Sequence, residues 1–499
     1  MTQQEALADH EIARRATRGA ATYLVRSTAG QVAQAISALA VSRVLLPREY
    51  GVIALSLTLV GAVRWAADLG ITYALTVKRE VEESQLRIDA AVTLIVAVLG
   101  GGLIAAIWPQ LSLVREVGST AVWMGLAMAT VPLLAVPWVP AQVVMERELR
   151  FSELGRISLV ATLLLFTTQV VLLLLGFGMW SMAIAQMVGA ATTTVLTVRA
   201  VGRLYVPSLK GGAPALVREG LPYQGSVIAV ALTGTVVNIL VAAQLGARGI
   251  GLFAWCTILA TPVLAGLSSV HQVAAPTLAR MRRDDGRRYD ESVGVLMRTL
   301  VAIAAVAAGC LIGVTSPTIR FVFAERWLPA TSAVQICLAG VMVTAIQAVL
   351  VSDANARQMR RTTLVSSIAG AVATLAALWP LAAAGGVGGA AVAAYLIGPA
   401  VAVGVFVWAT RPPIAKPVWT AIRLFVPLLA LSFGLGHFIH TPVELAASCA
   451  LIAAAGAGLA YVVEGRLAMR ILRLLRTTTG RVGESTSPAV AVSGSVGGS

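Results

Sequence analysis

Long apolar runs separated by short polar and basic segments make up most of the chain. One helix needs roughly 20 apolar residues to cross a bilayer core about 30 Å thick. Fourteen runs approach or exceed this length, far longer than the roughly ten alternating residues of a membrane barrel strand. We therefore expect one membrane-spanning helix from each of 21–46, 50–77, 88–108, 119–143, 154–176, 180–199, 217–246, 250–276, 293–316, 331–352, 362–384, 386–410, 418–438 and 442–463.

The 38 Lys and Arg residues gather on one side of this predicted array. When the connections are numbered in turn, most of these residues fall at the termini and in the even-numbered connections. Arg26 and Arg64 lie inside apolar runs, and the other side holds Arg43, Arg48, Arg115, Arg248, Arg320 and Arg326. Short basic loops stay in the cytoplasm during insertion. The bias therefore predicts a multi-pass protein of the cytoplasmic (inner) membrane with both termini cytoplasmic.

Composition supports the membrane class. Hydrophobic residues make up 58% of the chain and charged residues 12%, and the mean hydropathy is +0.83, outside the range of soluble domains. The net charge of +15 is spread over many segments, without the aromatic–basic pattern that follows a phosphate backbone, so we expect contact with membrane lipids and not with nucleic acid. The four cysteines show no CxxC spacing, so we expect no metal site, and we expect no cofactor.

A weak internal repeat divides the helices. At an offset of 200 residues, 41–59 matches 241–259 at six positions, including Gly51 with Gly251. Both stretches are predicted to enter the membrane from the same side, which is a parallel repeat of the kind found in transporters that bind substrate between two halves. We therefore expect an all-α polytopic membrane protein of about fourteen transmembrane helices, in two six-helix lobes plus a C-terminal helix pair.

The expected units follow from this division. They are a cytoplasmic N-terminal segment (1–20), an N-lobe with helices 1–6 (21–205), a cytoplasmic linker (206–216), a C-lobe with helices 7–12 (217–412), helices 13–14 (413–465), and a cytoplasmic tail expected to be disordered (466–499).

Four stretches resemble the polysaccharide-exporting flippases of the multidrug/oligosaccharidyl-lipid/polysaccharide exporter superfamily. They are SRVLLPREYGVIALSLTLVGAVRWAADLGITYAL (42–75), MERELRFSEL (145–154), GFGMWSM (176–182) and FVFAERWLPA (321–330), in the family's order and spacing. The resemblance implies export of lipid-linked oligosaccharide units, usually on undecaprenyl pyrophosphate, to the outer leaflet. The chain departs from the family at Asn238, which lacks the Asp that relatives often have beside it, and at Ala324, which replaces a usual Gly.

Carrying a sugar and an anionic phosphate through hydrocarbon requires a hydrated groove with fixed positive charge, because unsatisfied polar groups are costly there. Arginine suits phosphate because its planar fork binds two oxygens at once. Arg64, near the middle of the second predicted helix, is the first candidate; a structural pair with Asp68, one turn away, is the alternative. Arg26 is the second candidate, and snorkelling to the interface explains it equally well.

Other polar residues at membrane depth extend the candidate set. Gln34 lies about two turns from Arg26 on roughly the same face, and we expect Gln34 and Asn238 to contact sugars, although polar residues also bind helices together. His271 is expected to titrate near neutral pH inside a predicted span, either for proton coupling or as a packing residue. Asp353, beside the basic segment 357–361, is a candidate for coupling or for structure, as is Asp68.

We therefore predict a flippase, without enzyme activity, that moves polyprenyl-pyrophosphate-linked oligosaccharides by alternating access for cell-surface polysaccharide biosynthesis. The expected partners are the lipid-linked substrate and membrane lipids, with a polysaccharide polymerase and glycosyltransferases as candidates. A multidrug or peptidoglycan-precursor exporter of the same superfamily is the nearest alternative. A drug exporter would favour acidic groups in its cavity for cationic substrates. A membrane glycosyltransferase or polymerase would need a larger loop with acidic or His residues, and a non-transporting assembly scaffold stays open.

Overall fold

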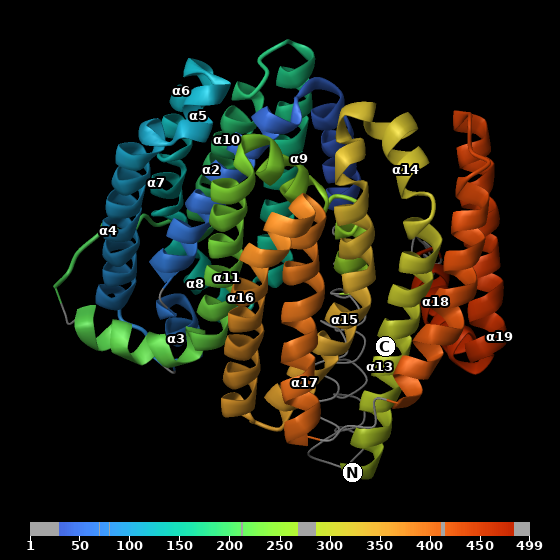
Figure 1. Ribbon diagram of the computed structural model, residues 1–499. Coiled ribbons are helices and arrows are strands. Elements are labelled where there is room, and N and C mark those ends of the chain that lie inside the picture. Colours follow the sequence, from blue (N-terminus) through green and yellow to red (C-terminus); the bar gives the residue numbers. More distant parts are fainter. Residues whose placement is uncertain are drawn as a thin grey trace, which may run out of the picture.

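The computed structural model describes residues 29–68, 70–78, 80–210, 213–267, 286–410 and 415–483. Within these ranges there is no strand, and long helices run roughly side by side in one bundle (Figure 1). By length and composition, 11 helical stretches in the described ranges could cross a membrane. The predicted all-α polytopic class is confirmed.

The helices have the following bounds. After a helix at 29–44 come α2 (Pro47–Asp68), α3 (Ile71–Val77), α4 (Glu83–Ile107), η1 (Trp108–Gln110), α5 (Ser112–Val117), α6 (Ser119–Met128), α7 (Val131–Ala135), α8 (Trp138–Arg147), α9 (Phe151–Leu174), α10 (Trp180–Val201), α11 (Ala213–Trp255), a helical stretch at 261–267, α13 (Gly286–Ile312), α14 (Thr315–Thr318), η2 (Ile319–Phe323), η3 (Glu325–Ala330), α15 (Thr331–Ala356), α16 (Arg360–Ala391), η4 (Val392–Ile397), α17 (Gly398–Thr410), α18 (Ala415–Gly436) and α19 (Pro442–Gly483).

Glycines with positive φ interrupt two long helical stretches that are continuous in the sequence. The apolar stretch Arg361–Thr410 has 50 residues, too long for one crossing, and it is interrupted at Gly386, whose φ is 56°. Beyond this break α16 and α17 lie beside each other (Figure 1). Gly246, with φ 67°, interrupts α11 in the same way. The predicted spans 21–46 and 250–276 continue outside the described residues, so the count of fourteen stays a prediction.

The two ends of the bundle differ. The end that carries α3 and the start of α13 is called the basic end, and the end that carries α5, α6 and α14 is called the opposite end (Figure 1). α18 and α19 stand together along one edge of the bundle, where α18 packs against α13. The lobe boundaries and the cytoplasmic placement of the basic end stay predictions from the sequence.

Aromatic side chains fill the core near the opposite end. Trp255 stacks on Trp327 with ring centroids 5.0 Å apart, and Phe323 meets Trp255 edge-on at 5.0 Å. Tyr50 at the start of α2 meets Trp327 edge-on at 5.7 Å. Such pairs add to the free energy that burial of the rings already contributes. The cluster therefore joins the first predicted half to the second at this end.

Candidate functional site

Arg64 lies on α2, roughly 25 Å along the helix from Pro47 at 1.5 Å per residue. The predicted span 50–77 is not continuous: α2 ends at Asp68, and Gly70, with φ 75°, precedes α3. Left-handed backbone of this kind ends a helix, and glycine adopts it without steric cost. Arg64 is therefore little more than one turn from the end of its helix, nearer the basic end than expected from the sequence.

Trp138 of α8 is the neighbour that the Arg64 side chain contacts. The guanidinium carbon lies 5.4 Å from the centroid of the Trp138 ring, within the distance at which a cation is attracted to an aromatic face. Among the described side chains Arg64 makes no ion pair. The side chain of Asp68 is not among them, so the predicted pair of these two residues stays untested.

Two cavities meet at Arg64. The large cavity, about 610 Å³, lies among α2, α7, α8, α9 and α10, and the small cavity, about 380 Å³, lies among α2, α3, α4, α7 and α8. Arg64, Trp138 and Gln142 line both. All lining residues lie between positions 61 and 197, so both cavities belong to the first predicted half. Arg64 therefore faces two cavities that lie within the first predicted half.

Prolines in the fourth predicted span make room beside Arg64. Instead of one helix over 119–143, the chain forms α6, α7 and α8, with Pro132 in the first turn of α7 and Pro137 just before α8. Proline lacks the N–H of a helical hydrogen bond, and its ring clashes with the preceding turn. The resulting offset of α7 and α8 places Trp138 and Gln142 beside α2.

The large cavity has a partly polar lining, in which most residues are apolar and the polar ones are Arg64, Gln142, Glu146, Ser158, Thr162, Gln186, Thr193 and Thr197. Gln142 Nε2 donates to Glu146 Oε1 at 2.6 Å. The Thr76 hydroxyl of α3 shares its single proton between the Thr72 carbonyl at 2.8 Å and Glu146 Oε2 at 3.2 Å. Both carboxylate oxygens of Glu146 are therefore bonded within the protein.

Two buried hydroxyls in the cavity walls lack partners. Thr197 lines the large cavity and is 0% exposed, and Thr93 lines the small cavity and is 2% exposed. In the described part of the chain neither Oγ1 has a hydrogen-bond partner. Buried polar groups are nearly always bonded in native proteins, so these two hydroxyls are candidates for a partner that the described residues do not supply.

The structure places Asn238 and Gln34 away from these cavities. Asn238 on α11 donates from Nδ2 to Thr58 Oγ1 on α2 at 2.9 Å, which ties the two predicted halves together. Gln34 is exposed on the helix at 29–44. Neither lines the large or the small cavity, so their predicted sugar contacts stay untested. Arg26 and His271 lie outside the described residues.

Asp353 belongs to a clamp at the basic end. Its Oδ1 accepts from Tyr289 Oη at 2.6 Å and from Arg357 Nε at 2.9 Å. Arg357 also donates to Asp290 Oδ1 at 2.7 Å. The hydrogen bond to Asp353 raises the pKa of Arg357 above its ordinary value. The clamp joins the start of α13 to the end of α15 and favours the structural reading of Asp353.

A second contact set, which we call the seal, joins segments 42–45 and 321–327 at the opposite end. Arg43 donates to the carbonyls of Phe321 at 2.8 Å and of Val322 at 3.0 and 2.8 Å. In return, Arg326 donates to the carbonyl of Arg43 at 2.8 Å, and Trp327 Nε1 donates to the carbonyl of Ser42 at 2.9 Å. Sequence reasoning did not assign these residues a role. Arg43 and Arg326 did stand out, however, as two of the few basic residues on their side.

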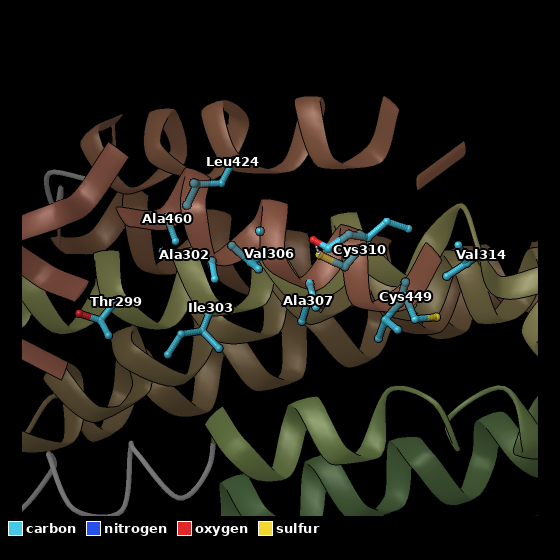
Figure 2. A pocket seen from close by; sticks show the side chains of 15 residues that line it. Thr299, Ala302, Ile303, Val306, Ala307, Cys310, Val314, Leu424, Cys449 and Ala460 are labelled. Atoms are coloured by element: carbon cyan, nitrogen blue, oxygen red, sulfur yellow. Dashed lines mark hydrogen bonds between the residues drawn. The ribbon is translucent and has the colours of Figure 1, made fainter. Parts of the chain in front are cut away.

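A further cavity, of about 460 Å³, lies between α13, α18 and α19. Figure 2 shows lining side chains along α13, with Leu424 of α18 and Cys449 and Ala460 of α19. Its walls are almost entirely apolar and carry no charged residue. They offer a sugar or a phosphate no charged partner, and Arg64 with its two cavities is therefore the candidate site.

Comparison with known proteins gives the family. A model of the polysaccharide biosynthesis protein family matches residues 40–332. The succinoglycan biosynthesis transport protein ExoT of Rhizobium meliloti (strain 1021) is 26% identical over 294 residues, which cover 57% of this chain and 58% of ExoT. The match thus spans little more than half of that relative.

Solved structures show the fold. Lipid II flippase MurJ in an inward closed conformation aligns with a TM-score of 0.69 at 11% identity, covering 88% of this chain and 98% of that one. An inward-facing multidrug resistance transporter of the MATE family, in the MOP superfamily, aligns with a TM-score of 0.59 at 16% identity, covering 80% and 99%. Both likenesses concern the fold alone. The model of the polysaccharide biosynthesis protein family matches more than half of the sequence, and the chain therefore belongs to that family.

Proposed function

We propose that the protein is a flippase that moves polyprenyl-pyrophosphate-linked oligosaccharides across the cytoplasmic membrane for cell-surface polysaccharide biosynthesis. The observation that carries this proposal is Arg64, a cation within an apolar helical stretch that opens onto two partly polar cavities. A charged side chain in such a stretch is costly unless it meets water or a partner. The guanidinium can bind two phosphate oxygens at once, while the polyprenyl tail stays in the hydrocarbon.

Alternating access is supported by the unequal ends of the bundle. The seal closes the opposite end with reciprocal hydrogen bonds between the two predicted halves. The large cavity reaches Glu146 and Phe151, which flank the α8–α9 turn at the basic end. If the basic end is cytoplasmic, as the charge bias predicts, the substrate enters there and leaves once the seal opens.

Membrane potential is the driving force that we propose. A pyrophosphate that carries two negative charges outward across the full field gains about 4.6 kcal/mol per 100 mV, twice the value for one charge. Arginine that moved with the phosphate would reduce this gain. Flipping in vesicles that stays unchanged when the potential is abolished would contradict a potential-driven mechanism.

The proposal is tested by reconstitution of the protein into liposomes that contain undecaprenyl-pyrophosphate-linked oligosaccharide. Substrate that reaches the far leaflet is measured by its accessibility to an added glycosidase, with protein-free liposomes as the control. In cells, deletion is expected to leave the lipid-linked glycan on the cytoplasmic face. Absence of flipping for every polyprenyl-pyrophosphate glycan tested would contradict the proposal.

A peptidoglycan-precursor flippase is the second candidate, favoured by the fold likeness to lipid II flippase MurJ. The same liposome assay with lipid II as substrate distinguishes the two. Export of cationic drugs is less well supported, because the carboxylate in the large cavity, Glu146, is already bonded to Gln142 and Thr76.

A further inference from the structure

The cavities beside Arg64 differ in what they can hold, and this points to where the saccharide binds. We propose that the large cavity is the subsite for the sugar bonded directly to the pyrophosphate, with Trp138 as its stacking surface and Thr197 as a hydroxyl partner. This inference rests on the proposed function and deepens it. It places the first sugar in a cavity of the first predicted half.

Size and chemistry of the large cavity suit a sugar. Its volume of about 610 Å³ lies within the roughly 300–1,000 Å³ of pockets that bury small ligands. Gln142, Gln186 and Ser158 in its walls are neutral groups that donate and accept hydrogen bonds, as sugar hydroxyls do. The cavity therefore has room for the first sugar units but not for a long oligosaccharide.

Thr197 supplies an independent sign of an occupant. Its hydroxyl is fully buried in the cavity wall and has no hydrogen-bond partner among the described residues. Because Thr197 is 0% exposed, its side chain must turn toward the cavity before a sugar hydroxyl, which both donates and accepts, can satisfy it. Thr93, which lines the small cavity, likewise has a buried hydroxyl without a hydrogen-bond partner among the described residues.

Arg64 and Trp138 lie next to each other, as do the pyrophosphate and the first sugar in the proposed substrate. Both side chains line both cavities, with the guanidinium carbon 5.4 Å from the ring centroid. Arg64 can therefore hold the phosphate while the indole face contacts the apolar C–H face of the attached sugar ring. Aromatic rings serve this purpose because they offer a broad, rigid apolar surface.

The described residues at the matching place in the second predicted half carry different chemistry. At the repeat offset of 200 residues, the position of Arg64 is taken by Leu264. The cavity of about 460 Å³ formed by α13, α18 and α19 carries no charged lining residue. The described residues therefore give the first half, and not the matching place in the second half, a cation for the headgroup.

The test compares two lipids that differ only in the sugar: undecaprenyl pyrophosphate and undecaprenyl-pyrophosphoryl-N-acetylglucosamine. Binding of each is measured to the full-length protein in lipid nanodiscs by microscale thermophoresis. The sugar-dependent gain is the ratio of the two dissociation constants. We expect wild-type protein to bind the glycosylated lipid more tightly.

Trp138→Leu should remove most of that gain, with about tenfold weaker binding of the glycosylated lipid and a smaller loss for the sugar-free lipid, because Arg64 also loses its aromatic neighbour. Thr197→Val, which exchanges a hydroxyl for a methyl group, should weaken only the glycosylated lipid, by about fivefold, and leave the unfolding temperature unchanged. Arg64→Leu should weaken both lipids. Trp123→Leu is the matched control, since Trp123 on α6 is 64% exposed and lies outside the cavities.

Each outcome decides between the two proposals. If wild-type protein binds both lipids equally, or if Trp138→Leu and Thr197→Val weaken both lipids alike, the sugar does not occupy the large cavity and the inference fails. If wild-type protein binds neither lipid, the proposed function itself fails. Should Trp138→Leu not fold, the Thr197→Val comparison alone decides.

Discussion

Gly51 and Gly251 pack backbone to backbone between α2 and the last turns of α11. A Cβ added to Gly51 would overlap the carbonyl oxygen of Ala247, and one added to Gly251 would overlap that of Pro47. Both glycines, and both carbonyls that they approach, are separated by the same 200 residues that the repeat in the sequence shows. The repeat is therefore visible as a reciprocal contact, which holds the two predicted halves together near the opposite end.

We predict that Gly51→Ala and Gly251→Ala each destabilise the protein by about 1–3 kcal/mol, the usual cost of overpacking. The obstructing atoms are main-chain atoms, which cannot move aside as a flexible side chain can. Thermal unfolding in nanodiscs measures the effect. Gly234→Ala on α11 is the control, because nothing lies within 4 Å of its added Cβ. Equal unfolding temperatures for all three variants would contradict the close contact.

Arg64→Lys and Arg64→Ala separate charge from geometry. If the guanidinium binds phosphate with two hydrogen bonds, Lys should retain only part of the flipping rate, and Ala should lose roughly ten- to hundredfold, as for lost bonds to a charged group. The liposome assay at equal protein content measures both. Full activity of the Ala variant would remove Arg64 from the mechanism.

Loss of the seal should open the opposite end. Arg326→Ala removes the bond to the carbonyl of Arg43, and Arg48→Ala, an exposed arginine on the same side, is the control. Cys256 is a suitable reporter, because it is 0% exposed and directly follows Trp255 of the aromatic cluster. In a background with the other three cysteines replaced by Ala, we expect roughly tenfold faster labelling by an impermeant maleimide, which corresponds to about 1.4 kcal/mol. Labelling as slow as in the Arg48 control would show that Arg326 does not hold this end closed.

Tyr289→Phe and Asp353→Asn test whether the clamp is structural. Because Tyr289 donates to a buried carboxylate, the Phe variant should lose about 1.5–3 kcal/mol of stability, the range for hydrogen bonds to charged groups. Flipping per folded molecule, and its dependence on pH, should match the wild type in both variants. A pH dependence that disappears in Asp353→Asn would instead assign Asp353 to coupling.

The fold was predictable because the length of an apolar run is itself the constraint that a bilayer imposes. The breaks within runs were harder, since Gly70 and Gly246 end helices through left-handed backbone that apolar periodicity does not record. The repeat was predictable at Gly51 and Gly251, because only glycine permits such close main-chain approach.

Of the residues that form the candidate site, only Arg64 was predictable from the sequence, because of its charge. Arg64 stands out in an apolar run, whereas Trp138 and Thr197 are ordinary helical residues until packing decides which helix faces meet around a cavity. Asn238 shows the same limit: it was expected to contact sugars, and its amide is bonded to Thr58. A polar residue in a membrane helix does not reveal from the sequence alone whether its partner is a ligand or another helix.

The acceptors of the seal are main-chain oxygens, which every amino acid supplies. Positions 42, 321 and 322 can therefore change their side chains without removing a bond of the seal, as long as the local backbone path is kept. All of the chemical constraint rests on three donors, Arg43, Arg326 and Trp327. Substitution of any of these three donors should therefore weaken the closure, whereas substitution at a position that contributes only a carbonyl should leave its hydrogen bond in place.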